Sequence, residues 1–217
     1  MPPRILTLSS PKGGVGKSSL CRNLMVCAAH ARQQVLGMDF DRQGTLTTWA
    51  ARRAELARQA PDCLPLPVRQ AELSDWRSSI AAAAQAEADL VVIDTPPSVE
   101  LNPAAILGIS AASTLVLVPC GQTQDDIDSV APWMAGLREA GVPAAFVLNR
   151  ASRRSRSFGA ARTKLLAHGP VCPVEVPLLE EIHLTAAKGL GVMDLSRAAC
   201  AETFEGLWRY VAWEMGR

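Results

Sequence analysis

The sequence has few aromatic side chains, no excess of either charge and no long apolar run. Of its 217 residues 5% are aromatic, and 22 lysines and arginines stand against 21 acidic residues. No stretch approaches the roughly 20 apolar residues that a membrane-spanning helix requires. The N-terminus lacks the long apolar stretch and the small-residue cleavage site of a secretory signal. We therefore expect a cytoplasmic protein without stable membrane insertion.

The six cysteines are scattered along the chain. They form no C-x-x-C pair, and no histidine lies beside them at metal-ligand spacing. This pattern disfavours a zinc site and a disulfide framework, so we expect reduced thiols. Apolar residues, in contrast, make up 48% of the chain, which is enough for a buried core and excludes a disordered protein.

Short apolar runs alternate with helical stretches almost from end to end. The expected buried strands are 5–8, 35–38, 90–93, 114–118 and 145–148, with weaker edge strands at 63–68 and 171–176. The expected helices are 17–32, 45–58, 71–86, 125–140, 156–168 and 196–215. This alternation predicts an α/β fold with one doubly wound, mostly parallel sheet flanked by helices. Because no linker, repeat or charge block divides the chain, we expect residues 1–217 to form one domain.

A glycine-rich segment, residues 11–19, lies between the first strand and the first helix; we call it the phosphate loop. Glycines let backbone N–H groups surround phosphate oxygens, and a following helix offers its positive N-terminal end. Lys17 is expected to reach the β- and γ-phosphates, and the Ser18 hydroxyl to bind Mg²⁺. The predicted nucleotide-binding residues of the loop are Lys12, Gly13, Gly14, Val15, Gly16, Lys17, Ser18 and Ser19.

Pro11 stands where the common phosphate-binding pattern has its first glycine, and Lys12 is an additional lysine. With these features the segment 12–18 resembles the deviant Walker A box of the ParA/MinD ATPases, closest to short ParA-type partition ATPases. The resemblance implies a P-loop NTPase fold with ATP and Mg²⁺ as cofactors. It also implies that Lys12 reaches the nucleotide of a partner subunit, so that ATP joins two chains into a homodimer. Only 11 residues precede Lys12, and we expect no N-terminal helix-turn-helix domain.

Three carboxylates follow predicted strands. Asp39 and Asp41 resemble the family's D-x-D-P-Q segment, with Arg42 in place of the proline. The resemblance implies that Asp41, together with Lys12 and Lys17, is catalytic and orients the attacking water, and that Asp39 lies near Mg²⁺. The alternative is that the two aspartates cap the next helix. Asp94 ends an apolar strand as a Walker B carboxylate does and is expected to hold Mg²⁺, with Ser18 and Asp39.

Two residues match positions that contact the base in this family. Asn149 ends the strand at 145–148, and Pro177 follows the last weak strand. The resemblance implies that both lie against adenine. An asparagine at the end of a strand is also a common turn residue, so the alternative for Asn149 is a structural role.

Residues 140–174 contain six basic residues and no acidic residue. They are Arg150, Arg153, Arg154, Arg156, Arg162 and Lys164. Flexible basic side chains of this kind suit contacts with the phosphate backbone of DNA, without base-specific geometry. The alternative is a solvated helix face. ParA-type ATPases bind DNA non-specifically as ATP dimers, so the resemblance favours DNA binding.

The resemblance implies a slow ATPase associated with the nucleoid and stimulated by a ParB-like or cargo-bound adaptor. Its expected function is the segregation of a plasmid or chromosome. One alternative is positioning of a protein assembly, such as a chemoreceptor cluster, a microcompartment or an envelope complex. A metabolic ATP-dependent ligase of the same superfamily is a further alternative. The apolar face of 196–215 lacks the lysines of a MinD-type membrane anchor, so we expect this helix to pack on the sheet.

Overall fold

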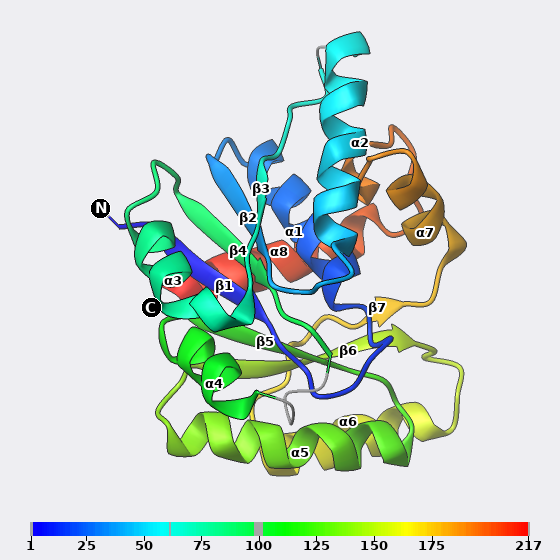
Figure 1. The fold of residues 1–217 in the computed structure, drawn as a ribbon. Helices are drawn as coiled ribbons and strands as arrows, with labels where there is room; N and C mark the ends of the chain where they lie inside the picture. The colour runs from blue at the N-terminus through cyan, green and yellow to red at the C-terminus, as the bar shows by residue number, and fades with distance from the viewer. Residues whose placement is uncertain (1, 61, 98–101, 217) are drawn as a thin grey trace.

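The computed structural model describes residues 2–60, 62–97 and 102–216. Its centre is one seven-stranded sheet with the order β3-β2-β4-β1-β5-β6-β7, in which all paired strands are parallel (Figure 1). The strands are β1 (Arg4–Leu8), β2 (Val35–Asp39), β3 (Val68–Gln70), β4 (Leu90–Asp94), β5 (Leu115–Cys120), β6 (Ala144–Ala151) and β7 (Val176–Pro177). The expected α/β fold with a parallel sheet is therefore confirmed.

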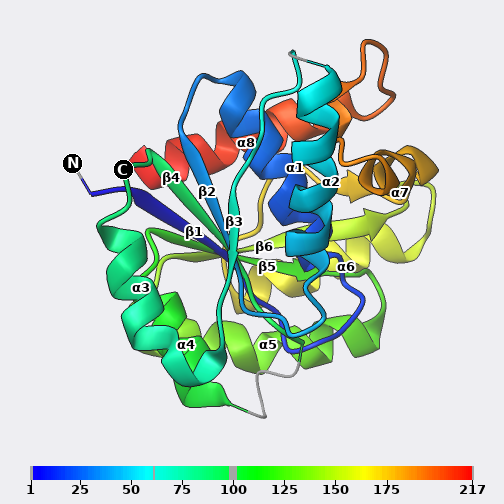
Figure 2. The same cartoon turned by 45° about the horizontal axis from the view of Figure 1, so that its top comes forward.

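Helices cover both faces of this sheet. They are α1 (Lys17–His30), α2 (Thr45–Gln59), α3 (Trp76–Ala84), α4 (Pro103–Ala111), α5 (Gln124–Glu139), α6 (Ser157–His168), α7 (Glu180–Ala187) and α8 (Ala201–Gly216), with short 3-10 helices η1 (Leu73–Asp75) and η3 (Val192–Asp194). The two views in Figures 1 and 2 place α1, α2 and α8 on one face and α3, α4 and α5 on the other. This is the doubly wound arrangement that the alternating pattern predicted.

The central strands are buried on both faces because their side chains are apolar at successive positions. Successive side chains of a strand point to opposite faces. In β1, Leu6 and Leu8 belong to the core that contains residues of α1 and α8. Ile5 packs instead with Ile80 of α3 and Ile109 of α4. Continuous apolar runs of this kind are typical of parallel sheets covered on both sides.

The C-terminal helix α8 packs into the main core, as expected. Its buried residues are Phe204, Leu207, Trp208, Val211 and Met215. All six cysteines are buried and unpaired. Within the described ranges, no helix combines the length and apolar character that crossing a bilayer requires.

Both weak strand predictions were wrong in extent. The strand expected at 63–68 begins only at Val68, after Pro65 and Pro67, which have no N–H group to donate to a ladder. In the segment 171–176, Val171 forms a single bridge to Phe146, and regular pairing is confined to β7. Prolines therefore shorten both edge strands of the sheet.

The helices also differ from the sequence prediction in four places. Helices α4 and α7 were not predicted. The helix expected at 71–86 begins at Trp76 after η1, and the helix expected at 196–215 begins at Ala201. Asn102 caps α4 by accepting the backbone N–H of Ala105 at 3.4 Å, and Pro103 follows it at the first helical position. This pair is a common helix start.

Candidate functional site

The predicted phosphate site lies at the carboxyl ends of the central strands. β1 is flanked by β4 on one side and β5 on the other, so the chain leaves β1 at the point where the strand order reverses. Ligands of open α/β sheets bind at such a point. The strand register places Leu8 of β1 beside Asp94 of β4, and Asp94 beside Asp39 of β2. Two of the predicted carboxylates are therefore neighbours at the end of the phosphate loop's own strand.

The phosphate loop leads directly into α1. Gly14 and Gly16 have φ values of 73° and 91°, in the region that favours glycine. A Cβ atom on Gly16 would lie 2.3 Å from the Nδ2 atom of Asn149, so this position has no room for a side chain. Gly16 is also the N-cap of α1, and no side chain caps that helix. The first-turn N–H groups of α1 remain for an anion.

Lys17 is a buried cation beside the loop. Its Nζ atom lies 3.3 Å from the carbonyl oxygen of Lys12 and 3.5 Å from that of Ser10. Burial lowers its pKa, and the charges of Asp94 and Asp41 oppose this effect. No carboxylate of the described residues lies within ion-pair distance of Lys17. Phosphate groups would supply the missing negative charge.

Asp94 is a buried carboxylate with unused oxygen atoms. Neither oxygen has a hydrogen-bond partner of good geometry among the described residues. Burial raises the pKa of Asp94 to about 7, against the opposing effect of the nearby Ser18 side chain. Carboxylate and hydroxyl oxygens are hard ligands that suit Mg²⁺. The residues present therefore fit a magnesium ion held by Ser18 and Asp94.

The described residues contain no group of three histidine, cysteine, aspartate or glutamate side chains that could hold a metal by itself. Mg²⁺ commonly takes only one or two protein carboxylates and completes its coordination with substrate phosphates and water. A sparse set of protein ligands is therefore what a magnesium nucleotide site requires.

Asp39 accepts hydrogen bonds from the first turn of α2, although the N-cap residue of that helix is Gly44. Its Oδ1 atom accepts the backbone N–H of Asp41 at 3.0 Å. Its Oδ2 atom accepts the N–H of Thr47 at 3.0 Å and the Thr47 hydroxyl at 3.1 Å. Burial raises the pKa of Asp39, and these hydrogen bonds act against the rise. Both Asp39 oxygens thus already accept hydrogen bonds, and a direct bond to Mg²⁺ would have to compete with these.

Asp41 is the carboxylate that faces open space. Its Oδ1 atom accepts the N–H of Gln43 at 3.0 Å. The side chain borders a cavity of about 290 Å³ that Lys17 and Ser18 also line. A water molecule in this cavity would have both a carboxylate and the phosphate loop beside it.

Lys12 forms an ion pair within its own chain. Its ammonium group donates to Asp126, near the N-terminus of α5, and 38% of the Lys12 side chain is exposed. The Asp126 hydrogen bond raises the pKa of Lys12. Burial raises the pKa of Asp126, but the hydrogen bonds from Lys12 and Thr123 outweigh it and lower the pKa overall. The additional lysine of the phosphate loop therefore has a carboxylate partner that the sequence did not reveal.

The two predicted adenine contacts lie close to the loop. Asn149 is buried, and its Nδ2 atom donates to the carbonyl oxygen of Val15 at 2.6 Å. Asn149 and Pro177 border a cavity of about 100 Å³, together with Ser19 and His183. A neighbouring cavity of about 420 Å³ extends from Asn149 to Lys12. The two cavities share Gly14 and Asn149 among their lining residues, so predicted nucleotide residues border both.

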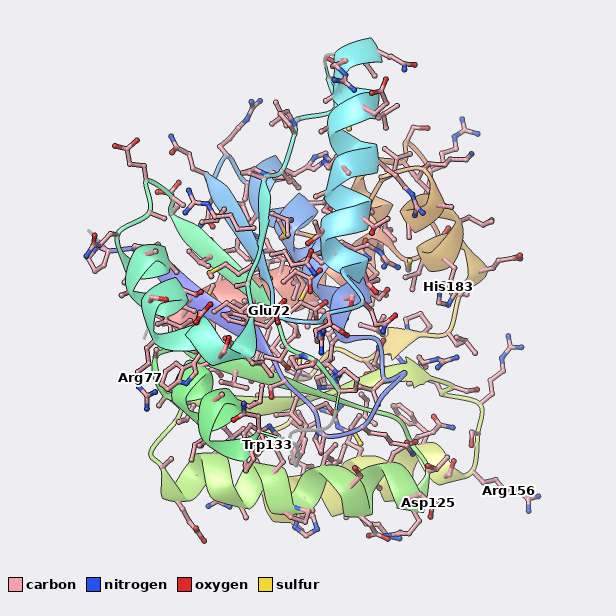
Figure 3. All side chains as sticks on the ribbon, in the orientation of Figure 1. Glu72, Arg77, Asp125, Trp133, Arg156 and His183 are labelled. Carbon is pink, nitrogen blue, oxygen red and sulfur yellow. The ribbon has the colours of Figure 1, made fainter. Side chains whose placement is uncertain are left out.

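The predicted DNA-binding residues occupy different environments. Arg153 and Arg162 both pair with Glu175, the latter at 3.8 Å. Arg150 donates to the carbonyl oxygen of Gly14 at 3.0 Å, and Lys164 donates to Gln124. Arg154 and Arg156 are exposed, and Figure 3 shows Arg156 projecting away from the body of the molecule. The run is therefore less uncompensated than its sequence implies, because Glu175 folds back onto it.

Two residues at the site were not predicted. Arg22, on α1, lines the same cavity as Asp41, and its Nη2 atom donates to the Ser19 hydroxyl at 2.9 Å. Burial lowers the pKa of Arg22 to about 10. His183 (labelled in Figure 3) borders the cavity from α7. The available signal for Arg22 was a charged residue inside the helix that follows the phosphate loop, whereas His183 lies on a helix that was not predicted.

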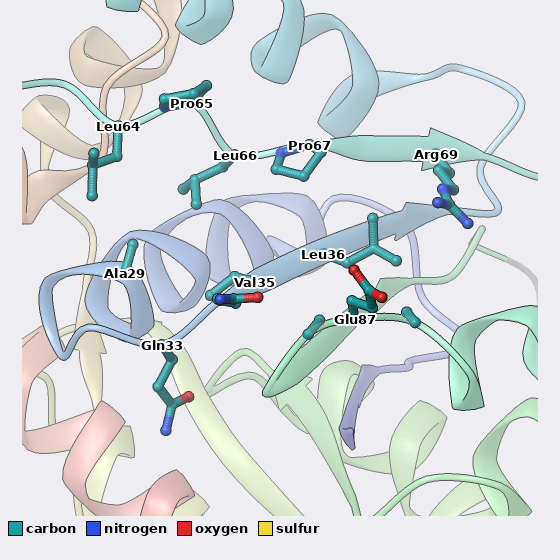
Figure 4. A pocket seen from close by; sticks show the side chains of 13 residues that line it. Ala29, Gln33, Val35, Leu36, Leu64, Pro65, Leu66, Pro67, Arg69 and Glu87 are labelled. Atoms are coloured by element: carbon teal, nitrogen blue, oxygen red, sulfur yellow. The ribbon is translucent and has the colours of Figure 1, made fainter. Parts of the chain in front are cut away.

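Another cavity lies away from the phosphate loop. It measures about 540 Å³ and is shown in Figure 4. Val35 and Leu36 line it where β2 begins, together with the proline-containing segment 64–67 and polar Arg69 and Glu87. It is therefore at the amino end of β2, whereas the phosphate loop follows the carboxyl end of β1. None of the predicted site residues lines this cavity.

Comparisons with known proteins agree with this geometry. A model of the CobQ/CobB/MinD/ParA nucleotide binding domain matches residues 6–192. The maintenance of carboxysome distribution protein A of Gloeobacter kilaueensis is 31% identical over 122 residues, covering 54% of this chain and 49% of that protein. The chromosome-partitioning ATPase Soj of Thermus thermophilus is 30% identical over 160 residues, covering 63% of this chain and 62% of that protein. The matched region is thus less than two thirds of either relative.

The fold also matches solved structures. The septum site-determining protein MinD of Pyrococcus horikoshii, complexed with Mg-ADP, superimposes with a TM-score of 0.75 at 20% identity. The match covers 96% of this chain and 95% of that one. At this identity the likeness concerns the fold. The family match covers most of the sequence, includes the phosphate loop and ends beyond α7, and it shows that the chain belongs to the CobQ/CobB/MinD/ParA nucleotide-binding domain family.

Proposed function

We propose that this chain is an ATPase that dimerises on binding ATP, binds DNA non-specifically and segregates a plasmid or chromosome. The observation that carries the proposal is the set of unmatched charges around the phosphate loop. Among the described residues, buried Lys17 has no carboxylate within ion-pair distance, and neither oxygen of buried Asp94 has a hydrogen-bond donor of good geometry. A magnesium nucleotide would match both. The partition role is supported by the similarity to Soj, and residues 1–217 would act as one domain.

In this proposal the loop binds ATP, and each residue has a separate task. The N–H groups of the phosphate loop and the Lys17 ammonium group would hold the β- and γ-phosphates. Mg²⁺, held by Ser18 and Asp94 with Asp39 beside them, would offset phosphate charge. Asp41 would accept a hydrogen bond from the attacking water and orient it toward the γ-phosphate. Asn149 and Pro177 would border the adenine base.

The dimer would form by an exchange of partners at Lys12. The ammonium group would leave Asp126 of its own subunit and bind the nucleotide of the other subunit. Two facing triphosphates repel each other, so cations supplied across the interface would be needed to bring them together. Hydrolysis would remove a γ-phosphate and part of this attraction, and the dimer would separate.

DNA binding would use the basic residues after β6. Exposed Arg154 and Arg156 are the most accessible of them. Arg150 would couple this surface to the phosphate loop through its bond to Gly14. Doubling the surface in an ATP dimer would increase the number of phosphate contacts and steepen the salt dependence. An adaptor on the cargo, ParB-like in the partition reading, would stimulate hydrolysis and release the dimer from the nucleoid.

The first test is retention of the purified protein on DNA with ATP, with ADP and without nucleotide, at two salt concentrations. We expect retention with ATP only, and it should weaken steeply as salt rises. A matched variant, Arg154→Ala with Arg156→Ala, should bind ATP normally but be retained less. Equal or absent retention in all three nucleotide states would contradict the DNA-binding proposal and favour a metabolic relative.

Two substitutions separate dimerisation from hydrolysis. Lys12→Ala should abolish the ATP-dependent dimer in light scattering while ATP still binds through Lys17. Asp41→Ala should leave an ATP-bound dimer that stays on DNA because hydrolysis has stopped. A normal dimer in the first variant, or normal phosphate release in the second, would remove that residue from its proposed role.

The second candidate function is positioning of a protein assembly. The similarity to a maintenance of carboxysome distribution protein favours it. Both candidates need the ATP dimer and DNA, and they differ in the adaptor. Stimulation of ATP hydrolysis by a centromere-binding protein would support segregation, whereas stimulation by a component of the assembly would support positioning.

A further inference from the structure

Arg22 is a buried arginine without an ion-pair partner. Its residue is 6% exposed, and no carboxylate of the described residues lies within ion-pair distance of it. Nη2 donates to the Ser19 hydroxyl at 2.9 Å and to the carbonyl oxygen of Ile182 at 3.1 Å. The Nε atom is buried and has no acceptor. One guanidinium group therefore joins the phosphate loop to α7, with donor capacity left over.

This arrangement is unfavourable without a ligand. A buried charge needs a partner, because the interior stabilises it far less than water does. Arg53, another buried arginine of the described residues, has an ion-pair partner. It pairs with Asp194 at 2.7 Å and also donates to two backbone carbonyl oxygens. Asp194 thus lies beside buried Arg53, whereas no carboxylate of the described residues lies within ion-pair distance of buried Arg22.

The phosphates of a bound nucleotide would supply the missing negative charge. Arg22 lines the cavity that Lys17, Ser18 and Ser19 also line. Arg22 follows Ser19 by about one helical turn, so it lies next to the residues that are proposed to bind the phosphates. His183 borders the same cavity and follows Ile182, the residue whose carbonyl Arg22 holds.

We propose that Arg22 is a positioning residue that the phosphates of bound nucleotide match electrostatically, and that it fixes α7 against the phosphate loop when nucleotide is present. The proposal rests on the nucleotide binding of the proposed function, and it is independent of DNA, dimer and cargo. Nucleotide charge stabilises the guanidinium group, which then holds both Ser19 and Ile182. The segment 180–187, with His183, becomes ordered against the cavity as a consequence.

The test uses the monomer with Mg-ADP, so that hydrolysis and dimerisation do not contribute. ADP affinity is measured by calorimetry for the natural protein, Arg22→Gln and Arg22→Lys, and hydrogen exchange of 180–187 is followed with and without saturating ADP. We expect the glutamine variant to bind ADP about tenfold to a hundredfold more weakly, as for a lost charge-assisted interaction. The lysine variant should recover part of the affinity. ADP should slow exchange of 180–187 in the natural protein and much less in the glutamine variant.

A purely structural role predicts different results. Arg22→Gln would then melt at a lower temperature without nucleotide, yet bind ADP and protect 180–187 as the natural protein does; that outcome overturns the proposal. A natural protein that binds no ADP would overturn the proposed function itself. Should Arg22→Gln not fold, Arg22→Lys decides: unchanged affinity together with unchanged protection of 180–187 by ADP would count against the positioning role.

Discussion

Two of the regions that bury charge differ in how that charge is matched. Around Arg53 the matching is complete. The guanidinium group contacts both oxygens of Asp194, at 2.7 and 3.1 Å, donates to the carbonyl oxygens of Leu64 and Gly189, and lies 5.6 Å from the ring centre of Trp49. Around the phosphate loop, Lys17, Arg22 and Asp94 each lack such a partner. The Arg53–Asp194 pair connects α2 to η3, whereas the unpaired charges around the phosphate loop favour the binding of a charged ligand.

This contrast between the two regions indicates where a ligand binds in the fold. Native structures satisfy nearly all of their buried polar groups, so each exception needs an explanation. Here most of the exceptions among the described residues belong to Ser9, Ser10, Arg22 and Asp94, near the carboxyl ends of the central strands where ligands of α/β sheets bind, and Ser110 and Trp133 lie elsewhere. The same chain satisfies a buried arginine elsewhere. Incomplete matching at the loop is therefore a property of that place.

The greatest loss of stability is expected when the Arg53–Asp194 ion pair is removed. Asp194→Ala would leave the buried Arg53 guanidinium without its carboxylate, and removing one member of a buried pair costs about 3–5 kcal/mol. We expect the free energy of unfolding, from urea titration, to fall by this amount while ADP affinity stays the same. Asp62→Ala, at an exposed position, is the control and should change stability little. A loss below 1 kcal/mol for Asp194→Ala would show that the Arg53–Asp194 pair does not stabilise the fold in this way.

The next effect concerns the unmatched carboxylate. The pKa of Asp94 is raised to about 7 in the folded protein, so the folded state binds more protons than the unfolded state between about pH 4 and 7. Stability without nucleotide should therefore decrease as the pH rises through this range, by on the order of 4 kcal/mol for this group. In Asp94→Asn this decrease should be absent, and the stabilisation by Mg-ADP should be lost.

Unfolding of the natural protein and Asp94→Asn at pH 5 and pH 7.5 measures the difference. Other carboxylates titrate equally in both, so they cancel. Parallel pH profiles for the two proteins would contradict the unmatched state of Asp94.

A smaller effect tests the shape of the phosphate loop with a matched pair of glycines. Gly14→Ala and Gly16→Ala both place a side chain at positive φ, which costs roughly 1–2 kcal/mol. Only at Gly16 would the new Cβ atom collide with Asn149, whereas at Gly14 nothing lies within 4 Å. We expect Gly16→Ala to lose roughly 1–3 kcal/mol more stability and most of its ADP affinity. Equal behaviour of the two variants would mean that Asn149 moves aside freely.

The smallest effect is expected at the surface pair. Asp126→Asn removes the carboxylate partner of Lys12 in a partly exposed site. Exposed ion pairs contribute about 0–1 kcal/mol, so urea unfolding should change by less than 1 kcal/mol, in contrast to Asp194→Ala. A loss of several kcal/mol would show that Lys12 has a structural role in the monomer.

The sequence was sufficient to predict the central strands and the place of the glycine-rich segment between the first strand and the first helix. Continuous apolar runs and a glycine-rich turn are local signals, whereas the ligand contacts of the phosphate loop remain predictions. Helix α4 was missed because its sequence is apolar on nearly all sides and carries no helical periodicity. The roles of Glu175 and Asp126 could not be seen, because each meets its basic partner from a distant part of the chain, 22 and 114 residues away. Arg22 was visible only as a charged residue inside the helix that follows the phosphate loop.

The bond between Lys12 and Asp126 has a consequence for the proposed dimer. A lysine that already has a partner contributes only the difference between two interactions, the one it leaves and the one it gains, and it does so twice in a symmetric pair. Dimer affinity would then be set by Asp126 as much as by ATP. Added salt would weaken both sides of the exchange and partly cancel. Subunits could therefore have their association threshold adjusted by a residue that never touches the nucleotide.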